Sequence, residues 1–346
     1  MSFDTPATAD TCAFTAVPVV DIGVRMDGRV ARLLLAERLG NISHHVGFVI
    51  VTGHGITSEV IGDALEQAAG FFALSEADKR SIDKRSSRHF RGWEPVGSES
   101  TNNRPDMREQ IDLWTDHPSR PRDALPRYLR LLGPNQWPPE QLAPGFRPAL
   151  ERWFAEMGAL ADDLLRLLAL SLELEENHFD AAFGNERMSL TKLISYPETP
   201  PGQFGVNAHH DTGFMTILAP GTTPGLEIEN AEGDWIPVPV VPGSLVVNLG
   251  EILHSQTPRP TSSDRLDLIR CNPRISRKVS HGDRGVSPWT SRTASDGVRD
   301  AAPSPARSQR PPRSADAPHS TTYLPCAPRP RGEARRGRCC RGDPPR

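Results

Sequence analysis

A histidine and an aspartate two positions apart, His209 and Asp211, are the side chains in this sequence best placed to do chemistry. They lie near the start of the run AHHDTGFMTIL, whose second half is typical of a β-strand. A segment rich in glycine and proline precedes this run. Side chains at positions i and i+2 of a strand face the same side, whereas His210 would face the other way. One imidazole and one carboxylate are two of the three ligands in the 2-His-1-carboxylate site, which leaves open positions on Fe(II).

The His-x-Asp spacing has little specificity when taken alone. The chain has 11 histidines, and the pattern occurs three times, at residues 178–180, 209–211 and 281–283. Only the middle copy leads into an apolar strand pattern after a flexible segment. We therefore predict a metal site there, and a solvated pair of side chains in a loop is the alternative interpretation of the same residues.

Composition narrows the class of protein. The chain has 346 residues with 40 basic and 43 acidic side chains, a net charge of -3, which argues against a strongly basic nucleic-acid-binding protein. No run approaches the roughly 18 apolar residues of a membrane helix, and the N-terminus has no signal-peptide pattern. Five cysteines without a CxxC pair indicate a reduced compartment. We expect a cytoplasmic protein that acts on a small molecule, with no membrane or nucleic-acid partner.

The last part of the chain differs from the rest. Residues 281–346 contain 13 arginines, no lysine, 11 prolines and 6 acidic residues, with few large apolar side chains. Such a segment cannot bury enough apolar surface to offset its ordering entropy, so it is predicted to be a disordered tail. An arginine-rich arm that binds RNA or anionic surfaces is one alternative. An out-of-frame reading of a GC-rich gene is another, and resequencing the gene would test it.

The hydrophobic pattern predicts the elements that position the His-x-Asp pair. Helices are expected over 29–46, over 58–74 with Ser58 as N-cap, and over 150–172, and short strands over 18–23 and 47–56. Between residues 186 and 276, short β-rich runs alternate with turns such as NAEG, which is typical of an antiparallel sandwich or barrel.

Several of these segments occur in an order that is typical of one family. They are VPVVDIG, GFVIVTGHGI, FFALSEADKRSI, RGWEPVGSE, MREQIDL, QWPP, AHHDTGFMTIL and GLEIENAEGDWIPVPVVPGSLVVNLGEILHSQT. From about residue 17 to 276 the chain resembles the iron- and 2-oxoglutarate-dependent oxygenases of the isopenicillin N synthase type. The resemblance implies a mainly β fold, with a double-stranded β-helix (jelly-roll) core and flanking N-terminal helices. The expected organisation is a flexible 1–16, an N-terminal region 17–183, an apparently incomplete core 184–280 and a disordered tail 281–346.

The resemblance also implies roles for individual residues. His209 and Asp211 would hold the iron together with a distal histidine some 55 residues further on. Arg274 and Ser276 match the family's Arg-x-Ser pair, which binds the far carboxylate of 2-oxoglutarate through a planar guanidinium fork and a hydroxyl donor. Tyr196 resembles a family tyrosine close to 2-oxoglutarate, and a tyrosine of the core is the alternative.

The distal histidine is where this sequence departs from the family. The expected positions 264–266 read Asp-Arg-Leu, His254 comes too early, and His281 follows Arg274 and is therefore in the wrong order. Asp264 would offer an oxygen ligand in its place, although Fe(II) favours imidazole.

The sequence is therefore compatible with two functions. The first is an Fe(II) and 2-oxoglutarate-dependent oxygenase that uses O2 on a small molecule and releases succinate and CO2, with ascorbate as a candidate reductant. The second is a catalytically impaired relative with weak metal binding.

Overall fold

The computed structural model describes residues 13–121, 126–183, 187–198, 203–221, 223–256, 275–278 and 285–293, the last two ranges as backbone strands only. Two compact units are distinguished, Met1–Asp300 and Ala301–Arg346, and the second lies wholly outside the described residues. Among the helices of the described ranges, none has both the length and the apolar character needed to cross a membrane.

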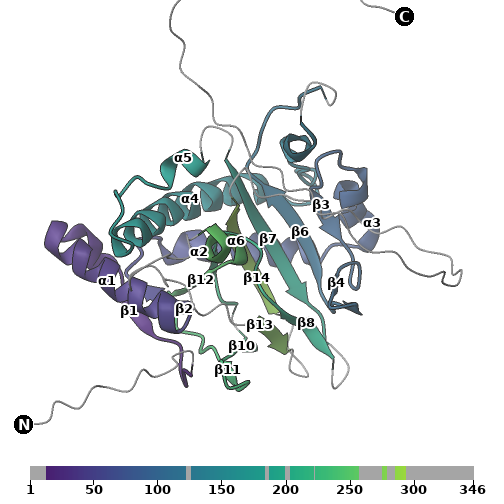
Figure 1. The fold of residues 1–346 in the computed structure, drawn as a ribbon. Coiled ribbons are helices and arrows are strands. Elements are labelled where there is room, and N and C mark those ends of the chain that lie inside the picture. Colours follow the sequence, from purple (N-terminus) through teal and green to yellow (C-terminus); the bar gives the residue numbers. More distant parts are fainter. Residues whose placement is uncertain are drawn as a thin grey trace, which may run out of the picture. The chain divides into compact units, whose positions relative to one another are not determined.

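An eight-stranded sheet forms the larger of two facing layers (Figure 1). Its strand order is β1-β2-β12-β9-β14-β7-β6-β3, and every pair is antiparallel except β1 with β2. The strands are β1 (Val19–Asp21), β2 (Phe48–Thr52), β3 (Gly92–Glu94), β6 (Glu109–Trp114), β7 (Met188–Tyr196), β9 (Met215–Leu218), β12 (Leu245–Leu249) and β14 (Gly285–Thr293).

A four-stranded antiparallel sheet forms the second layer, in the order β11-β10-β13-β8. Its strands are β8 (Phe204–His209), β10 (Leu226–Glu229), β11 (Trp235–Pro237) and β13 (Ile275–Lys278). The predicted hairpin at NAEG joins β10 to β11, where the side-chain oxygen of Asn230 accepts from the backbone N–H groups of Glu232 and Asp234. A separate two-stranded hairpin consists of β4 (Ser100–Thr101) and β5 (Arg104–Pro105).

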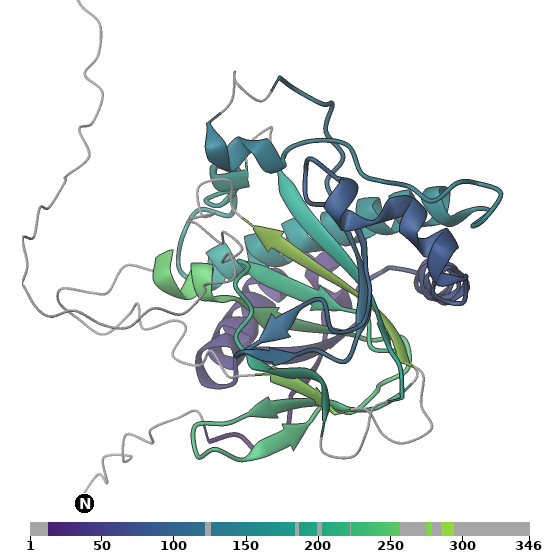
Figure 2. The ribbon, with the colours of Figure 1, turned by 90° about the vertical axis from the view of Figure 1, so that its right-hand side faces the viewer.

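The long helices cover the outer face of the large sheet. The helices are α1 (Arg29–His45), α2 (Ser58–Phe72), α3 (Glu76–Lys79), α4 (Phe146–Ser171), α5 (Asp180–Phe183) and α6 (Glu251–Gln256), with 3-10 turns at Gly23–Met26, Arg80–Ile82, Lys84–Ser86 and Arg127–Leu131. The apolar stripe of α4 is buried with alternate residues of β6, β7 and β9 in the main core. In Figure 2 the green strands β10 and β11 lie at the foot of the view, away from α4.

A second, smaller core joins the two sheets at one end. Phe48 and Ile50 of β2 and Val246 of β12 pack there against Ile228 of β10 and Val238. The same strands send their other alternate residues, such as Val49 and Val247, into the helix-covered core. This period of two fixes which side chains of the large sheet face the smaller sheet.

The structure corrects three expectations. The fold is mixed α and β rather than mainly β, because three long helices are needed to bury the outer face of the large sheet. Helix α2 is capped by Thr57, whose hydroxyl accepts from the N–H of Val60, rather than by Ser58. Residues Gly285–Thr293 form strand β14 inside the segment for which disorder was predicted. The rest of that tail and the region boundaries remain predictions.

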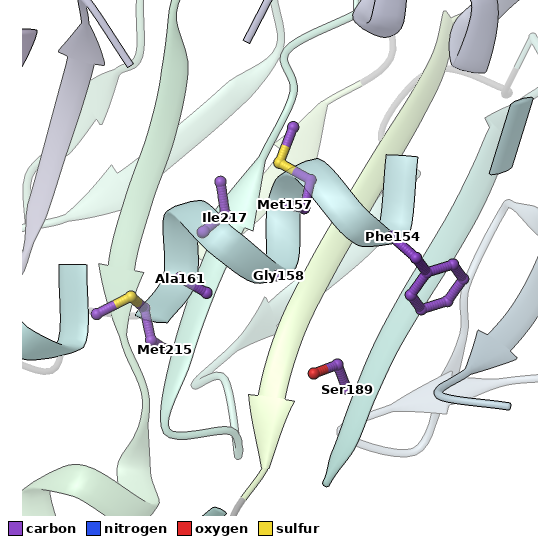
Figure 3. A pocket seen from close by; sticks show the side chains of 7 residues that line it. All are labelled: Phe154, Met157, Gly158, Ala161, Ser189, Met215 and Ile217. Atoms are coloured by element: carbon purple, nitrogen blue, oxygen red, sulfur yellow. The ribbon is translucent and has the colours of Figure 1, made fainter. Parts of the chain in front are cut away.

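A small apolar pocket lies between α4 and the large sheet (Figure 3). Met157 and Gly158 of α4 face Met215 and Ile217 of β9 across it. These residues belong to the outer face of the sheet, opposite to the face that looks toward the smaller sheet. We interpret the pocket as a packing void of the core rather than as a ligand site.

Truncation of a side chain beside this void should destabilise the fold. Met157 is fully buried, and Met157→Ala should lower the free energy of unfolding by about 2–5 kcal/mol, because it enlarges a cavity that rigid neighbours already leave open. Glu156→Ala, on the exposed side of the same turn, should change it by less than about 0.5 kcal/mol. Urea unfolding followed by circular dichroism measures both, and equal effects would contradict the assignment of the core.

Candidate metal centre

His209 is the last residue of β8, and its ring is oriented by its own strand. The Nδ1 atom lies 2.8 Å from the carbonyl oxygen of Asn207. A carbonyl oxygen only accepts hydrogen bonds, so Nδ1 must carry the proton and donate it. The other ring nitrogen, Nε2, then faces Asp211, with 3.5 Å between Nε2 and Oδ1.

Asp211 lies just beyond the end of β8, is 6% exposed and is held from the opposite sheet. The side-chain amide of Asn248, on β12, donates to Oδ2 over 2.8 Å, which leaves Oδ1 toward His209. The N–H of Glu251, at the start of α6, donates to the carbonyl oxygen of Asp211 over 2.8 Å.

The turn between β12 and α6 approaches Asp211 so closely that it requires glycine. A Cβ atom at Gly250 would lie 2.0 Å from the carbonyl oxygen of Gly213. Any other residue at position 250 would push the turn away from the loop that carries Asp211. The hydrogen bond from the N–H of Glu251 to Asp211 would then be lost.

The two side chains stabilise each other's charged forms. Burial alone would lower the pKa of His209, but the hydrogen bond and charge of Asp211 outweigh it and raise this pKa. Burial alone would likewise raise the pKa of Asp211, yet His209, Asn248 and Thr216 bring it below the usual value. The carboxylate is therefore ionised at neutral pH.

These donors fit the Fe(II) that the resemblance implies. One imidazole nitrogen is available once Nδ1 is committed, and a buried carboxylate oxygen lies beside it. A backbone carbonyl that accepts from the second ring nitrogen is the usual partner of a ligating histidine. Imidazole with carboxylate is also the donor chemistry of non-haem Fe(II) sites. The predicted pairing of His209 with Asp211 on one side is thus present, and His210 is exposed.

The other predicted site residues divide into two groups. Tyr196, at the end of β7, is buried and hydrogen-bonds Arg108, which in turn lies within electrostatic reach of His209. Ser276 is on β13, the strand that pairs with β8 and places Ile275 opposite His209. Arg274 and Asp264 lie outside the described residues, as does the side chain of His254.

A buried network of charges lies near this pair and was not predicted from the sequence. Lys84 Nζ lies 2.6 Å from Asp112 Oδ2 and 2.8 Å from Glu94 Oε2. Lys192 Nζ lies 3.0 Å from Asp112 Oδ1 and 3.2 Å from Glu99 Oε1. These two cations hold the pKa of Asp112 at about 2 against the opposing effect of burial.

The three carboxylates of this network are close enough together to hold a metal ion. Two ammonium groups already lie among them, and the guanidinium of Arg108 lies 2.8 Å from Glu99. Three cations thus compensate the three carboxylates without a metal. The sequence signal that could have revealed the network is a charge in the middle of an apolar strand. Asp112 in EQIDLW and Lys192 in MSLTKLISY are directly opposite each other in register.

Two family descriptions together match most of the chain. Residues 17–140 match the non-haem dioxygenase in morphine synthesis N-terminal region, and residues 182–279 match the 2OG-Fe(II) oxygenase superfamily. The second match includes both His209 and Asp211.

Curated relatives share this assignment. Clavatol oxidase of Penicillium crustosum is 32% identical over 285 residues, covering 75% of this chain and 83% of that protein. A 2-oxoglutarate-dependent dioxygenase of Gibberella zeae is 36% identical over 247 residues, covering 69% of this chain and 64% of that protein, so the chain spans less than two thirds of that relative. A homoarginine-6-hydroxylase of Glycine max is 28% identical, covering 69% of this chain and 76% of that protein.

Solved structures show the same fold. A full-length Neurospora crassa protein in complex with alpha-KG superposes with a TM-score of 0.66 at 21% identity, covering 80% of this chain and 85% of that chain. A 2OG-Fe(II) oxygenase family protein of Caulobacter crescentus gives a TM-score of 0.68 at 22% identity, covering 81% and 88%. With its two sheets, its helical outer layer and its His-x-Asp pair at the end of β8, this chain belongs to the 2OG-Fe(II) oxygenase superfamily.

Proposed function

We propose that this chain is an Fe(II)- and 2-oxoglutarate-dependent oxygenase that oxidises a small molecule with O2 and releases succinate and CO2. The observation that carries the proposal is the geometry of His209. Its Nδ1 donates to the carbonyl oxygen of Asn207, which leaves Nε2 facing Asp211 Oδ1 at 3.5 Å. Membership of the superfamily supports it. Fe(II) bound there would supply open coordination positions for the cosubstrate and oxygen.

The remaining roles are assigned by position along the chain. Arg274 and Ser276 are proposed to bind the far carboxylate of 2-oxoglutarate, and Tyr196 to lie beside it. Ile275, between that arginine and serine, is the register partner of His209, which supports this placement. Asp264 is proposed as the third ligand, and ascorbate as the reductant that keeps the iron ferrous.

The described residues do the positioning. Asn248 and the N–H of Glu251 hold Asp211 from β12 and α6, so its carboxylate needs little reorganisation on binding a metal. Asn207 keeps His209 in the tautomer that can ligate. Arg108, which is hydrogen-bonded to Tyr196, lies within electrostatic reach of the same histidine.

The substrate is proposed only as a small molecule. The names of the relatives refer to compounds as different as homoarginine and clavatol. Hydroxylation, desaturation and cyclisation all start from the same metal centre, so the two described ligands do not select among them.

A catalytically impaired relative is the second candidate function. The observation that favours it is Asp-Arg-Leu at positions 264–266, where the family has its distal histidine. Loss of an imidazole ligand should weaken iron binding by more than the 10–100-fold typical of changes in the surrounding shell.

A matched pair of histidine variants tests the metal centre. His209→Ala should lose retained iron and all succinate formation, because no other imidazole faces Asp211 in the described residues. His210→Ala should keep both, since its side chain is exposed just beyond the end of β8. The assay mixes protein with Fe(II), 2-oxoglutarate, ascorbate and O2, and measures succinate together with iron retained after desalting.

The same assay separates the two candidate functions. Succinate from the wild type that falls in Asp264→Ala would support an active enzyme with an aspartate as third ligand. No succinate from the wild type, together with no retained iron, would support the impaired relative. Equal iron in His209→Ala and His210→Ala would overturn the assignment of the metal centre.

Metal binding should depend on pH in a direction set by His209. A proton on Nε2 competes with the metal, and the ion pair with Asp211 raises the pKa of His209 above 6.5. Affinity for Co(II) should therefore fall about tenfold per pH unit once the pH is below that raised pKa. Asp211 stays ionised throughout because its pKa is lowered. Anaerobic titrations between pH 6 and 8 measure this, and an affinity that rises toward acid pH would contradict it.

A further inference from the structure

Strand β8, which carries His209, is the edge strand of the four-stranded sheet. Its only partner among the described strands of that sheet is β13, and the register shifts twice along the pair, between Ile275 and Arg277 and between Arg277 and Lys278. A regular ladder does not hold β8 on this side. Ile275 pairs with His209, but the ladder beyond it is irregular, so contacts on the other edge of β8 also help to position the histidine.

The β4–β5 hairpin occupies that other edge (Figure 1). Asn102 and Asn103 form its tip, and both have positive φ angles, 52° and 61°, as a tight hairpin turn requires. The side-chain amide of Asn102 donates to the carbonyl oxygen of Ala208 over 2.6 Å. The hairpin thus binds the backbone of the residue directly before His209.

Asp106, directly after the hairpin, makes the second contact. Its side chain is buried, and Oδ1 accepts from the backbone N–H of Asn207 over 3.3 Å and from the side-chain amide of Asn207 over 3.2 Å. Its other oxygen, Oδ2, accepts from the hydroxyl of Thr101 at 2.8 Å and from Arg108 Nη2 at 3.2 Å. Each oxygen of the carboxylate is used.

These bonds connect in one direct chain to the ring of the histidine. Asp106 holds the peptide N–H of Asn207, and the carbonyl oxygen of the same residue accepts from His209 Nδ1. Asn102 holds the next carbonyl, that of Ala208. The hairpin therefore fixes the two residues whose backbone sets the direction of the imidazole.

We propose that the β4–β5 hairpin, through Asp106 and Asn102, positions His209 and so sets the metal affinity of the site. The inference rests on the proposed function, because it takes His209 as a ligand. Asp106 and Asn102 are positioning residues: neither contacts the metal pair in the described structure, and both act through β8.

Variants at the hairpin tip test this without risk to the core. Asn102→Gly removes the amide that binds Ala208 while glycine tolerates the positive φ angle. Asn103→Gly is the matched control, since it makes the same backbone change at an exposed neighbour with no bond to β8 in the described structure. Asp106→Asn is the stronger variant, because it weakens both bonds to Asn207.

The measurement is an anaerobic Co(II) titration of the full chain, with the visible spectrum of the bound ion as the second readout. Asp106→Asn should bind about tenfold more weakly, at the lower end of the effect of groups that orient ligands. Asn102→Gly should show a smaller loss, and Asn103→Gly none. The Co(II) spectrum should change in both Asp106→Asn and Asn102→Gly. Asn102→Gly should keep the unfolding temperature of Asn103→Gly, a combination that a purely structural role would not produce.

The failures of the two proposals are distinguishable. Wild-type affinity and spectrum in both Asn102→Gly and Asp106→Asn would overturn the positioning role and leave the metal centre intact. Co(II) binding that survives His209→Ala would overturn the metal centre, and the positioning role with it. Should Asp106→Asn fail to fold, the comparison of Asn102→Gly with Asn103→Gly decides alone, and equal affinities would overturn the inference.

Discussion

The hydrogen bond from His209 Nδ1 to the carbonyl oxygen of Asn207 is the interaction on which the site depends. It assigns the proton to one ring nitrogen and turns the other toward Asp211. That aspartate is past the end of the strand and is held by Asn248, which belongs to the other sheet. The contact between His209 and Asp211 therefore depends on the spacing between the two sheets. The small core around Ile228 and Val246 maintains that spacing.

The space between the sheets is apolar at one end and charged at the other. Asp112 and Lys192 stand opposite each other on β6 and β7, on the face that looks away from the helices. A slip of one residue in either strand would send these charges into the helix-covered core, so the ion pair opposes any other register. Buried ion pairs contribute little net stability, and specification of register is the role that the geometry supports for this one.

Much of the fold could be predicted because its signals are local. The helix expected over 150–172, the turn at NAEG and the β-rich run that becomes β7 each depend on residues close in sequence. His209 and Asp211 could be paired for the same reason, since two residues on one strand need no knowledge of the rest. The resemblance then supplied the architecture that local patterns leave open.

The residues that hold the site could not be predicted in this way. Asn248 lies 37 positions from Asp211, and Asp106 lies 101 positions from Asn207. Their roles follow from which strands become neighbours, and neither has a distinctive sequence context. The sequence around Lys84 did not predict its role either, because lysine is usually exposed. Only the structure shows that its side chain is buried and pairs with Asp112.

Strand β14 occupies a central position in the large sheet although its own sequence does not favour a central strand. It lies between β9 and β7 in the middle of the large sheet, yet it contains Pro288, which has no N–H to donate to either neighbour. Without β14 both neighbours would be edge strands with unpaired backbone groups. We therefore infer that pairing with β7 and β9, both of which are rich in apolar residues, determines the position of β14. The two candidate functions also depend on this late part of the chain. The sheet needs a strand at β14, whereas catalysis would need the side chains proposed at positions 264, 274 and 276, shortly before it.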